Sequence, residues 1–190
     1  VGVRGRWVAG VAAGMALVLA TPVTASASVA PVPDSTAQVA GGVYALAQVG
    51  DRTIVGGTFT RVGGKARGDI AAVRADGTVD PLFVPATNGK VDALAVSEDG
   101  STVFIGGRFT TVNDVPRANL AAVDAVTGAL VESWQADTTG TNPDVKALTV
   151  VGTRLYVGGR FGGIDGTTRK RFAALDAAAG TVVSSFRPRP

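Results

Sequence analysis

The chain has 190 residues, of which 26 are Gly, with no Cys, no His and a formal net charge of +3. Hydrophobic residues make up 46% and charged residues 17%, which is typical of a folded protein rather than a disordered one. Without His or Cys there can be no Ser-His-Asp or Cys-His catalytic group and no imidazole or thiolate metal site. Only oxygen-ligand cations such as calcium remain open, and neither a metal nor a cofactor is expected.

The N-terminal segment has the pattern of a secretory signal peptide. Arg4 and Arg6 precede an apolar run over 7–20, and a small-residue Ala-Ser-Ala site follows at 25–27. The run is shorter than the roughly 20 apolar residues that span a bilayer. We therefore expect residues 1–27 to be a cleaved signal peptide, bacterial export to the cell surface or medium, and no membrane association after cleavage. An uncleaved N-terminal anchor is the alternative.

The exported chain is expected to carry little net charge. Loss of Arg4 and Arg6 lowers the formal charge from +3 to about +1, because no Asp or Glu precedes Asp34. Such a chain has no broad basic surface, so no nucleic-acid partner is expected. A small basic cluster near the end is interpreted as a solvated face rather than a polyanion site; it comprises Arg169, Lys170, Arg171, Arg187 and Arg189.

Beyond the signal peptide the sequence divides into a linker and three repeats. Residues 28–42 are rich in Ala, Pro, Ser and Thr without an apolar period, which predicts a disordered or extended linker. The repeats are expected at 43–90, 91–144 and 145–190, because the same order of short motifs returns in each. A period of about fifty residues is typical of repeat architectures in which each copy is one supersecondary unit.

The most distinctive motif in each repeat is an apolar run that ends in Gly-Gly-x-Phe. It occupies 53–59, 103–109 and 155–161. Glycine inside a strand is destabilising unless a bulge or another backbone lies close, so we expect one of these at every glycine pair. The residues of this motif that we expect to be structural are Gly56, Gly57, Phe59, Gly106, Gly107, Phe109, Gly158, Gly159 and Phe161.

Each repeat is expected to form four short antiparallel strands. A first apolar strand precedes the Gly-Gly-x-Phe strand, and a turn containing Gly joins them. A polar loop of about eight residues leads to a third strand with an Ala-Ala pair, and a Gly turn leads to a fourth strand with an aromatic residue. The expected first strands are 43–47, 91–95 and 145–149, the third strands 69–74, 119–124 and 171–176, and the fourth-strand aromatics Phe83, Trp134 and Phe186.

No segment after Ala27 keeps a helical period for three turns. The expected fold class is therefore all-β, and four strands in about fifty residues is the arithmetic of a β-propeller blade.

The order of these motifs resembles a known repeat. Val-x-Ala-Leu-Ala, apolar-Gly-Gly-x-Phe-Thr, Arg-x-x-Leu-Ala-Ala-Val-Asp, Thr-Gly-x-Leu and a final aromatic residue resemble the delta-60 β-propeller repeat over Val43 to Pro188. That resemblance implies a secreted, often multidomain bacterial protein with no assigned chemistry. The first repeat departs from the pattern with Arg74, and the third with Gly162. The glycine pair and the last aromatic residue also resemble kelch repeats, a weaker likeness that implies the same architecture.

Three blades are expected to form only part of a propeller. Closed propellers have roughly four to eight blades, and an open stack leaves a sheet face exposed at each end. The sequence starts with Val1 and stops just past the last strand expected in the third repeat. Our hypothesis is that it is the N-terminal part of a longer protein or a truncated reading frame, with further blades or domains beyond Pro190.

Candidate binding residues are the polar residues that do not repeat between the copies. They lie in loops that a propeller gathers on one face, and the candidates are Asn113, Asp114, Asp144 and Asp165. The alternative is ordinary turn chemistry, which uses the same residue types. Calcium binding by these loops stays open, although no Asp-x-Asp-x-Asp-Gly loop is present.

Three arginines return in register, each eight positions after its Phe: Arg67, Arg117 and Arg169. A ligand would seldom need the same cation in every repeat, so a structural role is expected. We expect each to pair with a carboxylate such as Asp124 or Asp176 and so tie the loop to the third strand. Arg74 breaks this pairing in the first repeat.

These patterns favour a binding or structural scaffold for an unknown protein or carbohydrate. The alternative is an extracellular enzyme acting on carbohydrate or another polymer, with its carboxylates on the channel face. No catalytic residue can be named from spacing. An enzyme would place two carboxylates within about 10 Å in a pocket, whereas a scaffold would show isolated, solvated ones.

Overall fold

The computed structural model describes residues 37–188, and all regular structure in that range is β-strand. The expected signal peptide, 1–27, and the expected linker up to Thr36 lie outside the described residues. Between 37 and 188 there is no helix that could cross a membrane. The expectation of an all-β chain is confirmed for the described range.

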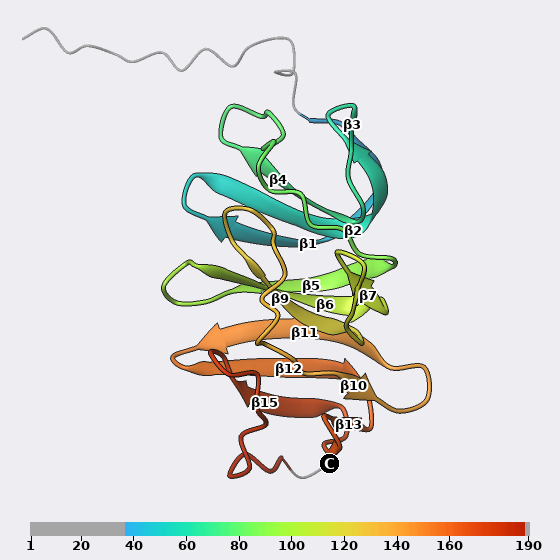
Figure 1. Cartoon of the computed structure of the whole chain (residues 1–190), viewed down its shortest axis with the longest axis vertical. Helices are drawn as coiled ribbons and strands as arrows, with labels where there is room; N and C mark the ends of the chain where they lie inside the picture. Colours follow the sequence, from blue (N-terminus) through green and yellow to red (C-terminus); the bar gives the residue numbers. More distant parts are fainter. Residues whose placement is uncertain (1–36, 189–190) are drawn as a thin grey trace, which may run out of the picture. The chain divides into compact units, whose positions relative to one another are not determined.

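Each repeat forms an antiparallel sheet whose three main strands follow one another in sequence (Figure 1). The middle strand of each sheet is the Gly-Gly-x-Phe strand, and it pairs with the first strand on one side and the third on the other. The strands of the first sheet are β1 (Val39–Val49), β2 (Arg52–Val62) and β4 (Ile70–Arg74); those of the second are β5 (Lys90–Val96), β6 (Thr102–Arg108) and β9 (Leu120–Asp124); those of the third are β11 (Asp144–Val151), β12 (Arg154–Arg160) and β15 (Phe172–Asp176).

The first sheet starts earlier than expected. β1 begins at Val39 rather than Val43, so the last residues assigned to the linker are part of a strand. Ala40 lies opposite Arg61, and Gly41 lies opposite Phe59. The lack of an apolar period hid this part of the strand, in which a register shift between Ala40 and Gly41 lets the pairing continue through the two glycines.

The expected fourth strand is reduced in every repeat to one bridge. Val79, Leu130 and Val182 each pair singly with the third strand of their repeat. The chain then turns, as the bond from the Trp134 N–H to the Val131 carbonyl (3.0 Å) marks in the second repeat. The aromatic residues therefore follow a turn rather than standing in a strand. Phe83 and Trp134 are buried in this way against the next sheet.

The expected polar loops contain small hairpins. Their two-residue turns have positive φ at both positions, as at Asn113 (49°) and Asp114 (64°), which suits a tight hairpin. The hairpin strands are β3 (Lys65–Ala66), which pairs with the end of β2, β7 (Thr111–Val112) with β8 (Val115–Pro116), and β13 (Gly163–Ile164) with β14 (Thr167–Thr168); β10 (Thr138–Thr139) adds to β13.

The glycine pairs serve both uses that sequence reasoning left open. The strand opposite each pair carries a register shift, for example between Val91 and Ala93. A Cβ on the second glycine of the pair, such as Gly107, would overlap the carbonyl oxygen of Lys90 on that strand. The second glycine is therefore required by close backbone approach at a bulge.

The first glycine of the pair has a different neighbour, which belongs to the next sheet. A Cβ on Gly56 would lie 2.6 Å from Val91 Cγ1 and 3.3 Å from Leu94 Cδ1. A Cβ on Gly106 would lie 2.5 Å from Val145 Cγ1 and 3.1 Å from Leu148 Cδ1. Two apolar side chains of one sheet therefore fill a socket that the missing side chain leaves in the preceding sheet.

We call the apolar pair the knob (Val91 and Leu94; Val145 and Leu148), the glycine the socket (Gly56; Gly106), and the contact between successive sheets a seam. Figure 1 shows the three sheets stacked face to face along these seams.

Most of the hydrophobic core lies in the two seams, and a smaller buried cluster, which includes Val55, Phe59 and Val62, belongs to the first sheet alone. Ile54, Ile70 and Phe83 are fully buried between the first and second sheets. In the second seam Trp134 is 1% exposed, and its ring centroid lies 5.4 Å from that of Phe104. Burying a large apolar side chain contributes roughly 1.5–3 kcal/mol, so stacking rather than any single sheet stabilises the fold.

Candidate functional site

The loops that were expected to gather on one face do meet. Each hairpin turn donates a backbone hydrogen bond to the segment that leads into its own sheet. Gly63 N–H donates to the Gln38 carbonyl (2.8 Å), Asn113 N–H to the Ala86 carbonyl (2.8 Å) and Asp165 N–H to the Asp137 carbonyl (3.0 Å). We call this surface the hairpin rim; it consists of the turns at 62–65, 112–115 and 164–167 and the leading segments at 37–38, 85–89 and 136–143.

Two of the candidate binding residues fasten the rim. Asn113 accepts from the Ala86 N–H (2.9 Å) and donates to the Gly128 carbonyl (3.0 Å). Asp165 accepts from the Asp137 N–H (2.8 Å). Burial raises the pKa of Asp165 although this hydrogen bond acts against it. Both side chains therefore hold loop to loop, as ordinary turn chemistry predicts.

Asp114 is the candidate that stays available. It is exposed at the tip of the second hairpin, and within residues 37–188 its carboxylate makes no hydrogen bond or ion pair. Its φ of 64° fits the turn. Asp114 is therefore the candidate whose side chain can meet a partner without breaking the rim.

The fourth candidate, Asp144, begins β11 and belongs to a chain of charged contacts, which we call the charge ladder. Lys146 Nζ is 2.8 Å from Asp144 and 2.9 Å from Asp92, which belongs to the preceding sheet. Lys90 Nζ is 2.8 Å from Asp92 and 5.4 Å from the centre of the Tyr44 ring. The charge ladder links all three sheets along their first strands.

Sequence reasoning did not single out Asp92 or Lys146. The signal was present, because Tyr44, Asp92 and Lys146 occupy the same position in the three first strands. An aromatic ring, an acid and a base at one repeated position are complementary when the sheets stack.

The charge ladder brings the carboxylates of Asp92 and Asp144 together, as the enzyme alternative requires, but both are paired with an ammonium group. Both lie within 2.9 Å of one ammonium, so the carboxylates of Asp92 and Asp144 are no more than about 6 Å apart. Burial acts to raise the pKa of Asp92, but its bonds to Lys90 and Lys146 outweigh this and hold the pKa below its usual value. The hydrogen bonds of Lys146 to Asp144 and Asp92 raise the pKa of Lys146. A general acid needs the opposite shift, so this pair is suited to holding sheets together.

The expected partners of the three recurring arginines are wrong. Each guanidinium donates to two main-chain carbonyls instead of a carboxylate: Arg117 bonds to Pro116 (2.8 Å) and Glu132 (2.9 Å). Arg67 donates to the carbonyls of Ala66 and Asp80, and Arg169 to those of Thr168 and Ser184. The arginines hold the segment that carries the aromatic residue. Their role is structural, as expected, but their partners are main-chain carbonyls rather than carboxylates.

Asp124 and Asp176 cap turns. The Asp124 carboxylate accepts from the N–H groups of Thr127 (2.7 Å) and Val126 (3.0 Å), and these bonds lower its pKa. Asp176 accepts from Ala178 (3.0 Å) and Ala179 (2.9 Å) in the same way. A carboxylate that caps its own turn is not free to pair with the arginine of its repeat.

The first repeat has Arg74 in place of this Asp, and there Asp80 is the carboxylate that forms ion pairs with arginines. The Asp80 side chain is 4% exposed and lies 3.0 Å from Arg52 and 3.1 Å from Arg74. Burial acts to raise the pKa of Asp80, but the Leu82 N–H and the two guanidinium groups lower it further than burial raises it. Arg52 also donates to the Ala125 carbonyl of the second sheet (3.0 Å), so this ion cluster is part of a seam.

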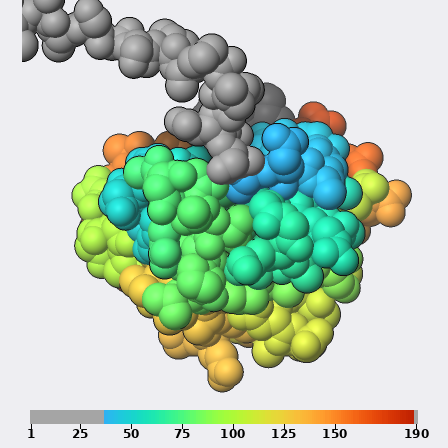
Figure 2. Space-filling view, turned by 90° about the horizontal axis from the view of Figure 1, so that it is seen from above, coloured from blue at the N-terminus to red at the C-terminus, as the bar shows by residue number. Residues whose placement is uncertain are grey.

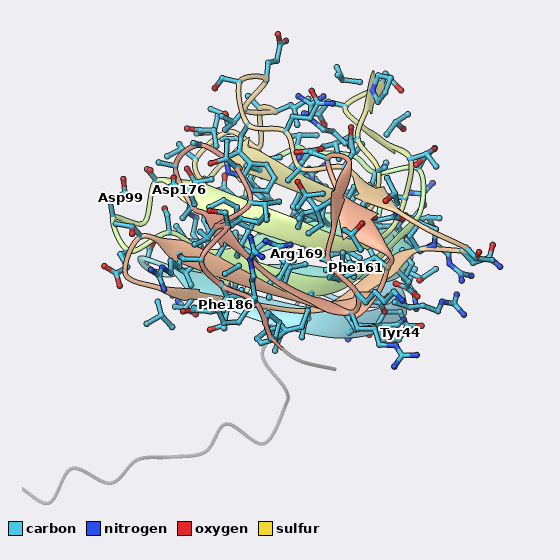
Figure 3. The ribbon with its side chains drawn as sticks, turned by 90° about the horizontal axis from the view of Figure 1, so that it is seen from below. Tyr44, Asp99, Phe161, Arg169, Asp176 and Phe186 are labelled. Atoms are coloured by element: carbon cyan, nitrogen blue, oxygen red, sulfur yellow. The ribbon has the colours of Figure 1, made fainter. Side chains whose placement is uncertain are left out.

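Two members of the basic cluster near the C-terminal end, Lys170 and Arg171, line an open hollow. This hollow of about 780 Å³ is lined by Arg160, Lys170, Arg171, Phe161, Phe172 and Pro188, among others. It opens at the last sheet, which Figure 3 views from below with Phe161, Arg169 and Phe186 labelled. Within the described range no group of three or more acidic side chains is placed to hold a metal ion.

A family model described as "Domain of unknown function (DUF5122) beta-propeller" matches residues 51–83. The match runs from the start of β2 to the buried aromatic residue of the first repeat. It agrees with the architecture, which is that of β-propeller blades stacked in an incomplete ring. A comparison with curated protein sequences found no match.

Several solved structures are similar. The structure of U3-55K superposes with a TM-score of 0.48 at 14% identity over 79% of this chain and 42% of that chain. The WD40 repeats of RRP9 give a TM-score of 0.48 at 14% identity over 79% of this chain and 41% of that chain. BamB from Moraxella catarrhalis gives a TM-score of 0.44 at 23% identity over 72% of this chain and 34% of that chain. The chain spans less than half the length of each of these structures.

Proposed function

We propose that the chain is an exported binding scaffold that contacts a protein or carbohydrate through the hairpin rim. The observation that carries the proposal is the contrast between a repeated framework and a rim that does not repeat. The glycine pairs and seams recur from sheet to sheet, whereas the corresponding hairpin turns read Gly-Gly at 63–64, Asn-Asp at 113–114 and Asp-Gly at 165–166. A rigid framework that presents variable polar loops is the usual arrangement of a binding surface.

An extracellular enzyme remains the second candidate, because Asp92 and Asp144 lie close to one ammonium. We favour binding, since the charge ladder neutralises these carboxylates and lowers the pKa of Asp92. If the pair were catalytic, Lys146→Gln would leave hydrolysis of a soluble polysaccharide panel intact or raise it by restoring acidity. The binding proposal expects no hydrolysis by the wild type or the variant.

The rim is tested by comparing variants on its tip and on the opposite edge of the sheets. The purified full chain is probed on a glycan array and against the secreted and surface protein fractions of its source organism. Asp114→Gly keeps the positive φ that the turn requires and removes the exposed carboxylate. Asp51→Ala changes an exposed carboxylate in the β1–β2 turn, at the other end of β2.

The expected result is that Asp114→Gly weakens binding of the probe at least several-fold while Asp51→Ala leaves it unchanged. Equal binding by both variants and the wild type would contradict a role for the rim. Loss of binding in Asp51→Ala alone would show that the binding site lies at the edge that carries the β1–β2 turn.

Export is tested separately. Production of the full chain in a bacterial host should yield a mature protein whose N-terminal residue is Ser28, because the small-residue site at 25–27 is the expected cleavage point. Mass spectrometry of the culture medium and the cell fractions measures this. Retention in the cytoplasm with residues 1–27 intact would contradict it.

A further inference from the structure

The two end faces of the stack carry the two halves of one seam. On the first sheet, Val43 and Leu46 occupy the positions of the knob residues, and they are 40% and 65% exposed. Their counterparts in the second sheet, Val91 and Leu94, are 0% and 8% exposed. Ala45 packs toward the second sheet, so alternation along β1 points Leu46 to the open side. The first sheet therefore presents a knob that no socket receives within residues 37–188 (Figure 2 looks onto this face).

The third sheet carries the matching socket, and it is empty. A Cβ on Gly158 would meet only Ala147, with the nearest atom at 3.6 Å. At the two filled sockets, Gly56 and Gly106, a Cβ would lie 2.6 and 2.5 Å from a valine methyl group of the following sheet. Gly158 is in the same strand position as these two glycines, so it is shaped for a knob that the described residues do not supply.

The apolar surface around the empty socket repeats that of a buried seam. Ile54, Ile70 and Phe83 are fully buried in the first seam, and Tyr156, Phe172 and Phe186 occupy the same positions in the third sheet. Phe172 is 41% exposed, and Phe186 lies on the open face in Figure 3. The three rings pack on one another, with centroids 5.2 to 6.2 Å apart, where an adjoining sheet would otherwise cover them.

Polar groups at the two ends are complementary as well. Arg52 crosses the first seam to the Ala125 carbonyl, and Arg154 is the exposed residue at the same position in the third sheet. The residues that correspond to Ala125 and Val126 in the first sheet are Ala75 and Asp76, so an Arg154 that crossed a seam would meet a carboxylate. The end members of the charge ladder, Tyr44 and Lys146, likewise form a cation–π pair if the ends meet, as Lys90 and Tyr44 already do.

We propose that the open face of the third sheet binds the open face of the first sheet of a second copy of this chain. Because each copy carries both faces, two copies related by a two-fold axis form two identical seams and leave neither face exposed. The three described sheets of each copy would together make a ring of six blades, within the range of about four to eight that closed propellers adopt. The proposal extends the established contacts between the sheets and uses a surface separate from the hairpin rim.

The test is the mass of the purified full chain in solution, measured by sedimentation velocity and light scattering over a hundredfold range of concentration. The wild type should form a dimer. Gly158→Val fills the socket, and Leu46→Asp places a charge on the knob; each should shift the dimerisation constant at least tenfold toward monomer. Both residues are on open faces, so circular dichroism should show that each variant keeps the fold of the wild type.

Val126→Asp is the matched control, since Val126 is 52% exposed but belongs to the middle sheet; it should dimerise like the wild type. A wild type that is monomeric at every concentration overturns the proposal, as do a dimer insensitive to both seam variants and an assembly that keeps growing with concentration. A monomer that binds a separately produced downstream segment of its own gene, in a manner sensitive to Gly158→Val, would also overturn it, because the occupant would then be a further blade.

Discussion

At the scale of single residues, the two glycines of each pair are required by contacts with different neighbours. The second, such as Gly107, makes room for the backbone of the adjacent strand, and the first, such as Gly106, makes room for side chains of the next sheet. The sequence predicts that both are structural, because they recur and because a strand does not otherwise favour glycine. It does not predict which neighbour each one meets, since that depends on the stacking of sheets far apart in sequence.

One residue in the third repeat is placed against its conformational preference. Arg171 has φ of 67°, at a position where the other repeats have Asp69 (63°) and Asn119 (66°). Asp and Asn tolerate this left-handed region better than Arg does. Arg171→Asn should therefore raise the free energy of unfolding by about 0.5–1 kcal/mol, measured by urea denaturation.

Lys170→Asn, next to it and without positive φ, is the control and should change stability by less than about 0.5 kcal/mol. A loss of stability in Arg171→Asn, or the same change in both variants, would show that the positive φ of Arg171 does not strain the backbone.

Asp80 makes a pH prediction possible. Its folded-state pKa lies below the unfolded value, so its contribution to stability is present above the unfolded pKa of about 4 and is lost as pH falls through the folded pKa. Hydrogen bonds from Ser97 and Ser101 lower the pKa of Asp99 to about 2, so other groups act in the same direction. Asp80→Asn should therefore be less stable than the wild type at pH 7, and the gap should narrow between about pH 5 and pH 2.

Chemical denaturation of the two proteins at each pH measures that gap. A difference that stays constant from pH 7 to pH 2, or that widens in acid, would exclude the ion cluster of Asp80 with Arg52 and Arg74 as its source.

At the scale of elements, the aromatic residue that ends each repeat works as an anchor only when another sheet follows. Trp134 is 1% exposed, and its indole N–H donates to the Ala177 carbonyl of the third sheet (3.0 Å), whereas Phe186 is half-buried. On the dilute, monomeric chain Trp134→Ala should cost about 3–5 kcal/mol of unfolding free energy, and Phe186→Ala about 1 kcal/mol. Thermal and urea unfolding measure both, and similar losses would mean that the aromatics act within their own sheets.

The three main strands of each repeat, the bulge or close approach at the glycine pairs and the meeting of the loops could be predicted from the sequence. Periodicity, Gly turns and repetition carry that information. The reduction of the fourth strand to one bridge and the partners of the arginines could not be predicted from the sequence. A single bridge followed by a turn has the same residue pattern as a strand, and Arg117 is satisfied by carbonyls that have no sequence signature.

The candidate site was predicted in part. Asn113, Asp114 and Asp165 lie on the hairpin rim as expected, but two of them hold its backbone together. Asp144 belongs to the charge ladder instead, and Asp92 completes it from another sheet. Contacts between sheets decide these roles, and one sequence read in order does not contain them.

At the scale of the whole stack, three copies of one module are stable because each knob fills the preceding socket. The seams supply most of the core, and a smaller cluster around Phe59 and Val62 lies within the first repeat. This explains why Leu46 in the first sheet and Phe172 in the third are exposed. Their counterparts in the middle sheet, Leu94 and Leu120, are buried.

The most direct measurement compares Gly106→Val with Gly158→Val in urea unfolding, at a concentration where the chain is monomeric. The two glycines have the same strand position, but only the socket of Gly106 is filled. Gly106→Val should lose about 1–3 kcal/mol through overpacking, and Gly158→Val should be neutral or slightly stabilising, because valine suits a strand better than glycine. Equal losses in the two variants, or a larger loss at Gly158, would contradict stacking by knob and socket.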